Sequence, residues 1–141
     1  QSSPSEKMER LLLQVMVRRA VSRSRSMSPT STQVTALTTA LEAAGLAVTL
    51  ARTVPAPLRS LADQLVRSAT SVAANLSEGH GRSGRDRLHH WHIAYASAKE
   101  VDSHLKLLLH AGVVNNSKAT RAIETFDEVR AMTWRLLHPR R

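Results

Sequence analysis

Apolar residues recur at alternating steps of three and four along almost the whole chain after residue 33, which is the spacing of amphipathic α-helices. Helix breakers divide this pattern into four stretches. The breaks fall at Pro55 and Pro57, at Gly79 and Gly81, and at Gly112. We expect Gly79 and Gly81 to take the left-handed conformation that closes a helix. No stretch alternates in the manner of a strand, so the sequence predicts an all-α chain with four helices.

The residues at the helix ends refine this prediction. Ser83 with Asp86 is typical of a capping box at the start of the third helix, and Asn115 offers an N-cap oxygen to the fourth, which ends before Pro139. Short links between helices of about 20–28 residues force neighbours to be antiparallel. We therefore expect an up-down-up-down antiparallel four-helix bundle. The apolar stripe of its first helix comprises Val34, Leu37, Leu41, Ala44, Val48 and Ala51.

Residues 1–30 differ from the rest, and we expect them to form a basic, flexible or short-helical extension to a bundle domain of residues 31–141. The segment is rich in Arg and Ser. Residues 5–21 fit a short amphipathic helix, and residues 22–26 are typical of a flexible basic linker.

The start of the chain raises two alternatives for this extension. The first residue is Gln1, whereas Met27 directly precedes a good helix lead-in. We interpret residues 1–26 as a segment that does not belong to the native protein. The alternative is a basic arm that binds nucleic acid or a membrane.

The basic charge points to a polyanionic partner. The chain has 20 Lys and Arg against 11 Asp and Glu, a formal net charge of +9, and most of its cations are Arg, whose fork suits phosphate. In an up-down bundle, the turn between the second and third helices and the end of the fourth helix share one end. An acidic protein partner is the alternative to nucleic acid. We predict a surface that binds RNA or DNA at Arg82, Arg85, Arg87, Arg135, Arg140 and Arg141.

Several function classes are disfavoured by composition. Without Cys there is no disulfide framework or thiol site. We see no apolar run of the length that a membrane span needs, so we expect a cytoplasmic protein without a membrane partner. Aromatic residues are few, and we assign Trp91 and Tyr95 to core or subunit contacts rather than to base stacking.

A metal site and an enzyme are also disfavoured. Asp86, His89 and His92 share one face of the third helix, and Glu100 with His104 forms a similar pair. Ferritin-like sites, however, need Glu-x-x-His motifs on two helices and further Glu residues. We expect no metal and no cofactor, and we expect the histidines near the start of this helix to add pH-dependent positive charge. No nucleophile–base arrangement or P-loop is present, so no enzyme is expected.

One stretch carries a family resemblance. The run from Gln64 to Gly79 resembles the signature of a bacterial four-helix bundle family first noticed as open reading frames in 23S rRNA intervening sequences. A second match lies in the third helix, and the similarity covers about residues 33–138. The chain departs from the pattern in having no aromatic residue in its first helix and a compact linker at residues 55–57. The matching residues singled out are Gln64, Arg67, Ser71, Asn75, Glu78, Gly79, Ser97 and Glu100.

The resemblance implies a homopentamer of basic bundles with no known catalytic activity. Accessory variability determinants of diversity-generating retroelements are similar proteins that form pentamers and bind nucleic acid and a reverse transcriptase. Self-association, RNA or DNA, and a reverse transcriptase or other protein are therefore the partners that the resemblance implies.

The side-chain chemistry of the matching residues favours a structural role. Asn75 falls on an apolar stripe, so we expect it to be buried and hydrogen-bonded. Ser97, like Ser71, is small enough to permit close helix approach. Arg67 is expected to pair with Glu100 or with Glu78 of the same helix, within one chain or between subunits.

Overall fold

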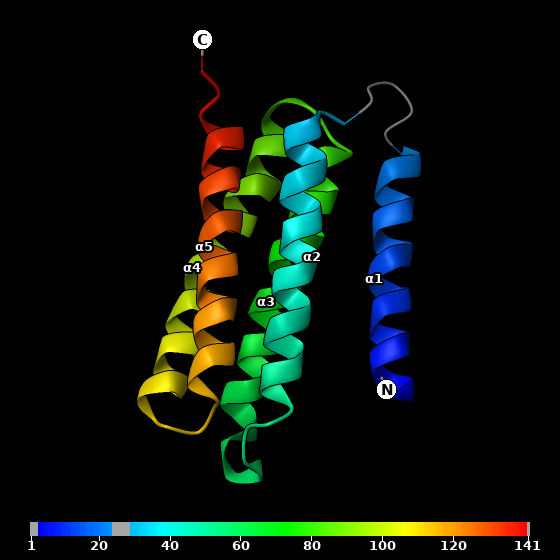
Figure 1. Cartoon of the computed structure of the whole chain (residues 1–141). Helices are drawn as coiled ribbons and strands as arrows, with labels where there is room; N and C mark the ends of the chain where they lie inside the picture. Colours follow the sequence, from blue (N-terminus) through cyan, green and yellow to red (C-terminus); the bar gives the residue numbers. More distant parts are fainter. Residues whose placement is uncertain (1–2, 24–28, 141) are drawn as a thin grey trace.

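The computed structural model describes residues 3–23 and 29–140, and within them the chain is all-helical, with no strand (Figure 1). The all-α prediction is confirmed. The four helices expected after residue 30 are present as α2 to α5, and a fifth helix, α1, precedes them. The elements are α1 (Pro4–Arg23), α2 (Ser31–Ala51), the 3₁₀ turn η1 (Ala56–Leu58), α3 (Arg59–His80), α4 (Gly84–His110) and α5 (Asn116–Leu137).

Helices α2 to α5 lie side by side, and each contacts two of the others: α3 packs on α2 and α4, and α5 packs on α2 and α4. In Figure 1 the start of α2, the α3–α4 turn and the end of α5 lie together at the upper end. We call this the basic end, because Arg82, Arg85 and Arg87 lie at the α3–α4 turn and Arg135 and Arg140 lie at and after the end of α5. The α2–α3 and α4–α5 connections lie at the other end, so residues far apart in the sequence share each end.

The face that α2 buries consists mainly of alanine. Ala36, Ala40, Ala43, Ala44 and Ala47 have no exposed surface, and these small side chains let α3 and α5 approach α2 closely. Leu37 and Leu50 are the larger side chains that α2 adds to the core, and the other helices contribute Leu65, Leu76, Leu105, Leu108 and Phe126.

The predicted stripe of α2 is confirmed at Leu37, Ala44 and Ala51, which are buried, and is wrong at the other three positions. Val34, assigned to the core, is 49% exposed, and Leu41 and Val48 are only half-buried. Because α2 contacts both α3 and α5, its buried face is set by two neighbours rather than by its own largest side chains.

The helix starts differ in how they are capped. Thr30 and Gln33 form a capping box before α2, with Oγ1 of Thr30 accepting from the Gln33 N–H at 3.1 Å. The Asn115 cap is confirmed, since its Oδ1 accepts from the Lys118 N–H at 3.0 Å. The Ser83 capping box is wrong, because no side chain caps α4 there. Asp86, its expected partner, is drawn away by an ion pair with the Arg82 guanidinium.

The prediction for Gly79 and Gly81 is also wrong. In the described residues, only Gly84 (φ 61°) and Gly112 (φ 71°) have positive φ. Gly79 lies inside α3, where a Cβ would stand 2.4 Å from Cδ1 of Trp91. Gly79 is thus required by close packing rather than by backbone conformation.

Helix α1 runs beside α3 and exposes much of its apolar surface, including Met8, Leu11 and Leu12. Its first turn is tied to the end of α2 by an ion pair of 2.9 Å between Glu6 and Arg52. The linker expected at residues 22–26 is wrong at residues 22 and 23, which belong to α1. Its residues 24–26, together with Gln1 and Met27, lie outside the described residues.

Among the described helices, α2 alone is long and apolar enough to cross a membrane by length and composition. The expectation that no segment reaches that length is wrong in this respect. Within the chain, α2 packs against α3 and α5, and 44% of its apolar window is buried.

Candidate nucleic-acid interface

Arg82, at the α3–α4 turn, is held between two carboxylates. Its guanidinium lies 2.7 Å from Oε1 of Glu78 and 2.5 Å from Oδ2 of Asp86. Hydrogen bonding to Arg82 lowers the pKa of Asp86, so this carboxylate stays ionised. Two negative charges thus offset one positive charge, and Arg82 contributes little to an anion-binding surface.

Arg87 is half-buried and holds the end of α3. Its Nε–H donates to the Gly79 carbonyl at 3.0 Å, and its Nη2 donates to the His80 carbonyl at 3.1 Å. The guanidinium also lies 5.3 Å from the centroid of the Trp91 ring. Both carbonyls belong to the last turn of α3, where that of Gly79 also accepts from the Arg82 N–H at 3.2 Å, and these contacts give Arg87 a structural role.

His80 is buried beneath this turn and is 7% exposed. Because an indole N–H can only donate, Nδ1 of His80 accepts from Nε1 of Trp91 at 3.1 Å, and Nε2–H of His80 donates to the Gln33 carbonyl at 2.8 Å. Burial lowers the pKa of His80 to about 4, against the weaker opposing effect of the hydrogen bond to Gln33. His80 is therefore neutral near pH 7 and adds no charge to the basic end.

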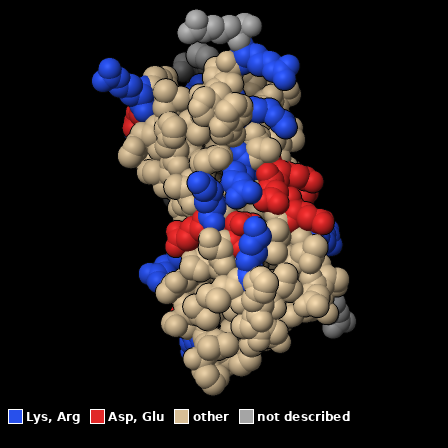
Figure 2. Space-filling view, turned by 90° about the vertical axis from the view of Figure 1, so that its left-hand side faces the viewer, with Lys and Arg blue, Asp and Glu red and all other residues tan. Residues whose placement is uncertain are grey.

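Three of the predicted arginines present their charge to solvent. Arg85, Arg135 and Arg140 are exposed and make no ion pair within residues 3–23 and 29–140. Arg141 lies outside the described residues. In Figure 2, which views the side of α4 and α5, Lys and Arg are visible at the upper end, with some Asp and Glu beside them, and again at mid-height, where more Asp and Glu lie.

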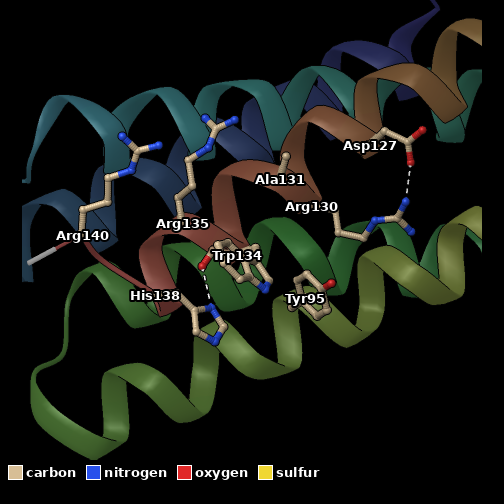
Figure 3. A pocket seen from close by; sticks show the side chains of 8 residues that line it. All are labelled: Tyr95, Asp127, Arg130, Ala131, Trp134, Arg135, His138 and Arg140. Atoms are coloured by element: carbon tan, nitrogen blue, oxygen red, sulfur yellow. Dashed lines mark hydrogen bonds and ion pairs between the residues drawn. The ribbon is translucent and has the colours of Figure 1, made fainter.

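A pocket of about 560 Å³ lies against the last turns of α5, between α5 and α4 (Figure 3). Trp134 is 49% exposed there, and its ring stacks on that of His138, with 4.2 Å between centroids and 23° between planes. The pocket is lined by Tyr95, Asp127, Arg130, Ala131, Trp134, Arg135, His138 and Arg140.

The sequence prediction selected Arg135 and Arg140 but not the exposed ring of Trp134, on which His138 stacks. The sequence did contain an indication of this exposure. Trp134 lies one residue off the apolar stripe that contains Val129 and Thr133, so helical periodicity places it outside the core. The core assignment of Trp91 is confirmed, since it is 4% exposed, whereas Tyr95 is half-buried and lines the pocket.

Three of the residues that match the family signature build a polar contact between α3 and α4. Oγ of Ser71 and Oγ of Ser97 lie 2.9 Å apart. Nδ2 of Asn75 donates to the Ser71 carbonyl at 2.9 Å, and its Oδ1 lies 3.0 Å from Nδ1 of His90. Asn75 is hydrogen-bonded as expected, but it is half-buried rather than buried.

The expected ion pair of Arg67 within one chain is wrong. Arg67 and Gln64 are exposed, and Arg67 makes no ion pair with any described residue. Glu78 pairs with Arg82, and Glu100 lies 3.3 Å from His104 of its own helix. The pairing between subunits remains a prediction.

The carboxylates and histidines of α4 do not converge on a common point. Within the described part of the chain, no three His, Asp or Glu side chains are grouped so that they could hold a metal ion. Asp86 is engaged by Arg82, and Nε2 of His90 is 3.9 Å from its Oδ1.

The chain is similar to a known protein family and to a solved structure. A family model described as 23S rRNA-intervening sequence protein matches residues 33–135. A crystal structure of a protein of unknown function from the S23 ribosomal protein family of Bacteroides thetaiotaomicron is similar in fold, with a TM-score of 0.69 and 21% identity. The match covers 75% of this chain and 97% of that one. No curated protein matches.

Proposed function

Because the chain belongs to the 23S rRNA-intervening sequence protein family, we propose that it is a non-enzymatic, homo-oligomeric protein that binds nucleic acid through its basic end. The observation that carries this proposal is the exposure of Arg85, Arg135 and Arg140 at one end, without an ion-pair partner among the described residues. Arginine forks suit phosphate oxygens, and each phosphate they neutralise releases counterions.

We assign phosphate binding to fewer arginines than the six that the sequence predicted. Arg82 is balanced by Glu78 and Asp86, and Arg87 is bonded to backbone carbonyls. We assign the phosphate contacts to Arg85, Arg135 and Arg140. The family's name refers to rRNA, which makes RNA the first nucleic acid to test.

We further propose that helices α2 to α5 form an up-down-up-down bundle and that several bundles associate, as a pentamer. The contacts of α3 and α5 with both α2 and α4 support the bundle. The exposure of Arg67, which has no ion-pair partner within the described chain, supports a contact with a second subunit. Mass measurement in solution tests the pentamer, and a monomer would contradict it.

Binding of a labelled structured RNA, measured by fluorescence anisotropy over a range of salt concentrations, tests the nucleic-acid role. The double variant Arg135→Gln/Arg140→Gln is expected to bind more weakly, and its log–log salt slope is expected to fall by about one for each lost phosphate contact.

The matched control is Arg59→Gln/Arg121→Gln, which removes the same charge from exposed positions at the opposite end. This control is expected to keep the wild-type slope. Equal losses in the two double variants would mean that net charge alone governs binding. Absence of RNA and DNA binding at low salt would refute the proposed function and would favour an acidic protein as the partner of the basic end.

A further inference from the structure

The pocket between α4 and α5 combines aromatic rings with cations. Tyr95 lies on α4, and Trp134 lies on α5 and is followed closely in the chain by His138. The volume of about 560 Å³ falls in the range of roughly 300–1,000 Å³ that is usual for sites of small organic groups. Its lining is neither a purely apolar groove nor a purely ionic surface.

The exposure of Trp134 has no explanation in the packing of the chain. The same helix fills the core with Phe126, Val129 and Thr133, which are all buried. Trp134 is the one tryptophan that leaves about half of its surface to solvent, since Trp91 is buried. Its apolar ring is therefore available to a ligand.

The ring of Trp134 is also held in a defined orientation. His138 stacks on it with 23° between the planes, and Nδ1–H of His138 donates to the Trp134 carbonyl at 2.9 Å. A ring that is already ordered loses little conformational freedom when a flat ligand stacks on it.

Two exposed arginines also line the pocket, but their side chains point away from the rings. In Figure 3 Trp134 and Tyr95 lie between α5 and α4, whereas Arg135 and Arg140 extend side by side from the end of α5, away from the rings. Arg130 is bound to Asp127 at 2.7 Å, which sets it apart from the two exposed arginines. The pocket thus offers a stacking surface for a flat group next to a separate place for negative charge.

We propose that this pocket receives one unpaired nucleobase of a single-stranded RNA segment, which stacks on Trp134 while Arg135 and Arg140 contact the flanking phosphates. This inference rests on the proposed function. It adds that the protein binds single-stranded RNA in preference to double-stranded RNA. Bases within a duplex are stacked on one another and present no free face, whereas unpaired bases stack readily on aromatic side chains.

The test compares two RNA probes of equal length, an oligouridylate strand and a fully paired duplex, with wild-type protein and with Trp134→Leu. Leucine keeps an apolar side chain but removes the flat ring. The variant is expected to bind the single strand about tenfold or more weakly and to bind the duplex with unchanged affinity. Trp134→Phe is expected to recover part of the single-strand affinity.

Leu107→Ala is the matched control, because Leu107 is 50% exposed and lies near the opposite end of α4. It is expected to bind both probes as the wild type does. If Trp134→Leu and the wild type bind the single strand with equal affinity, the pocket is not a nucleobase site. Duplex binding by the wild type would in that case still support the proposed function. A change in oligomer mass in Trp134→Leu, with RNA binding unaltered, would likewise overturn the nucleobase site. If neither probe binds the wild type, the proposed function fails and the pocket assignment fails with it.

Discussion

The Nδ1 atom of His80 accepts a hydrogen bond from the indole Nε1–H of Trp91 over 3.1 Å, and the two rings meet edge to face with 5.7 Å between centroids. The other ring nitrogen of His80 donates to the backbone of Gln33. One neutral side chain therefore joins α2, α3 and α4 directly beneath the basic end.

His80 makes the stability of the fold depend on pH. Its pKa is about 4 in the folded chain and 6.5 in the unfolded chain, so the unfolded state binds the extra proton between these values. The stabilising contribution is complete above pH 6.5 and is lost as pH falls toward 4, by about 3 kcal/mol in total. Urea denaturation at several pH values and one protein concentration measures this loss. Since glutamine can donate and accept but does not titrate, His80→Gln is expected to show a flatter profile, and parallel profiles would contradict the assignment.

Gly79 is predicted to tolerate no side chain. A Cβ at this position would lie 2.5 Å from Nε1 of Trp91, the atom that bonds His80, so Gly79→Ala must displace the indole. We expect the free energy of unfolding to fall by about 1–3 kcal/mol. Gly45 of α2 is the matched control, because nothing lies within 4 Å of its Cβ position. Gly45→Ala is expected to raise stability by about 0.5–1 kcal/mol, and thermal or urea unfolding that shows the same sign for both variants would refute this interpretation.

The hydrogen bond between Ser71 and Ser97 is predicted to couple α3 to α4 energetically. In a double-mutant cycle of Ser71→Ala and Ser97→Ala, the coupling free energy is expected to be about 0.5–1.5 kcal/mol. Ser103 provides the control, since it lies further along α4 and its Oγ bonds only Lys99 of its own helix. The cycle of Ser71 with Ser103→Ala should be additive, and additivity in both cycles would show that the inter-helix bond is energetically silent.

Arg67 is predicted to act between subunits. Arg67→Ala is expected to reduce the mass of the oligomer in solution while the helical circular dichroism signal stays unchanged, because no contact within the described chain depends on its charge. Arg121→Ala removes an exposed arginine from α5 and should leave the mass unaltered. An oligomer of wild-type mass in Arg67→Ala would exclude an essential ion pair at this position.

The sequence alone predicted the number of helices after residue 30 and their approximate ends, although two of the predicted end structures were wrong. Helical periodicity and breakers are local properties, so Pro57 before α3 and the Asn115 cap of α5 could be read directly. The signature from Gln64 to Gly79 also identified the family, whose model matches residues 33–135. The gathering of arginines at one end follows from connecting these helices by short links.

Tertiary structure decided which side chains those helices bury and which charges they leave unpaired. Periodicity places a stripe on a helix, but the neighbours choose its rotation, which is why α2 buries alanines and exposes Val34. The neutrality of His80 arises from its burial between helices, and the hydrogen bond to Gln33 of α2 opposes it only weakly. Likewise, Arg87 donates hydrogen bonds to carbonyls of α3, and Trp134 is exposed to solvent at the end of α5 that carries Arg135. Burial and pairing arise from contacts between elements, and a local sequence pattern does not contain them.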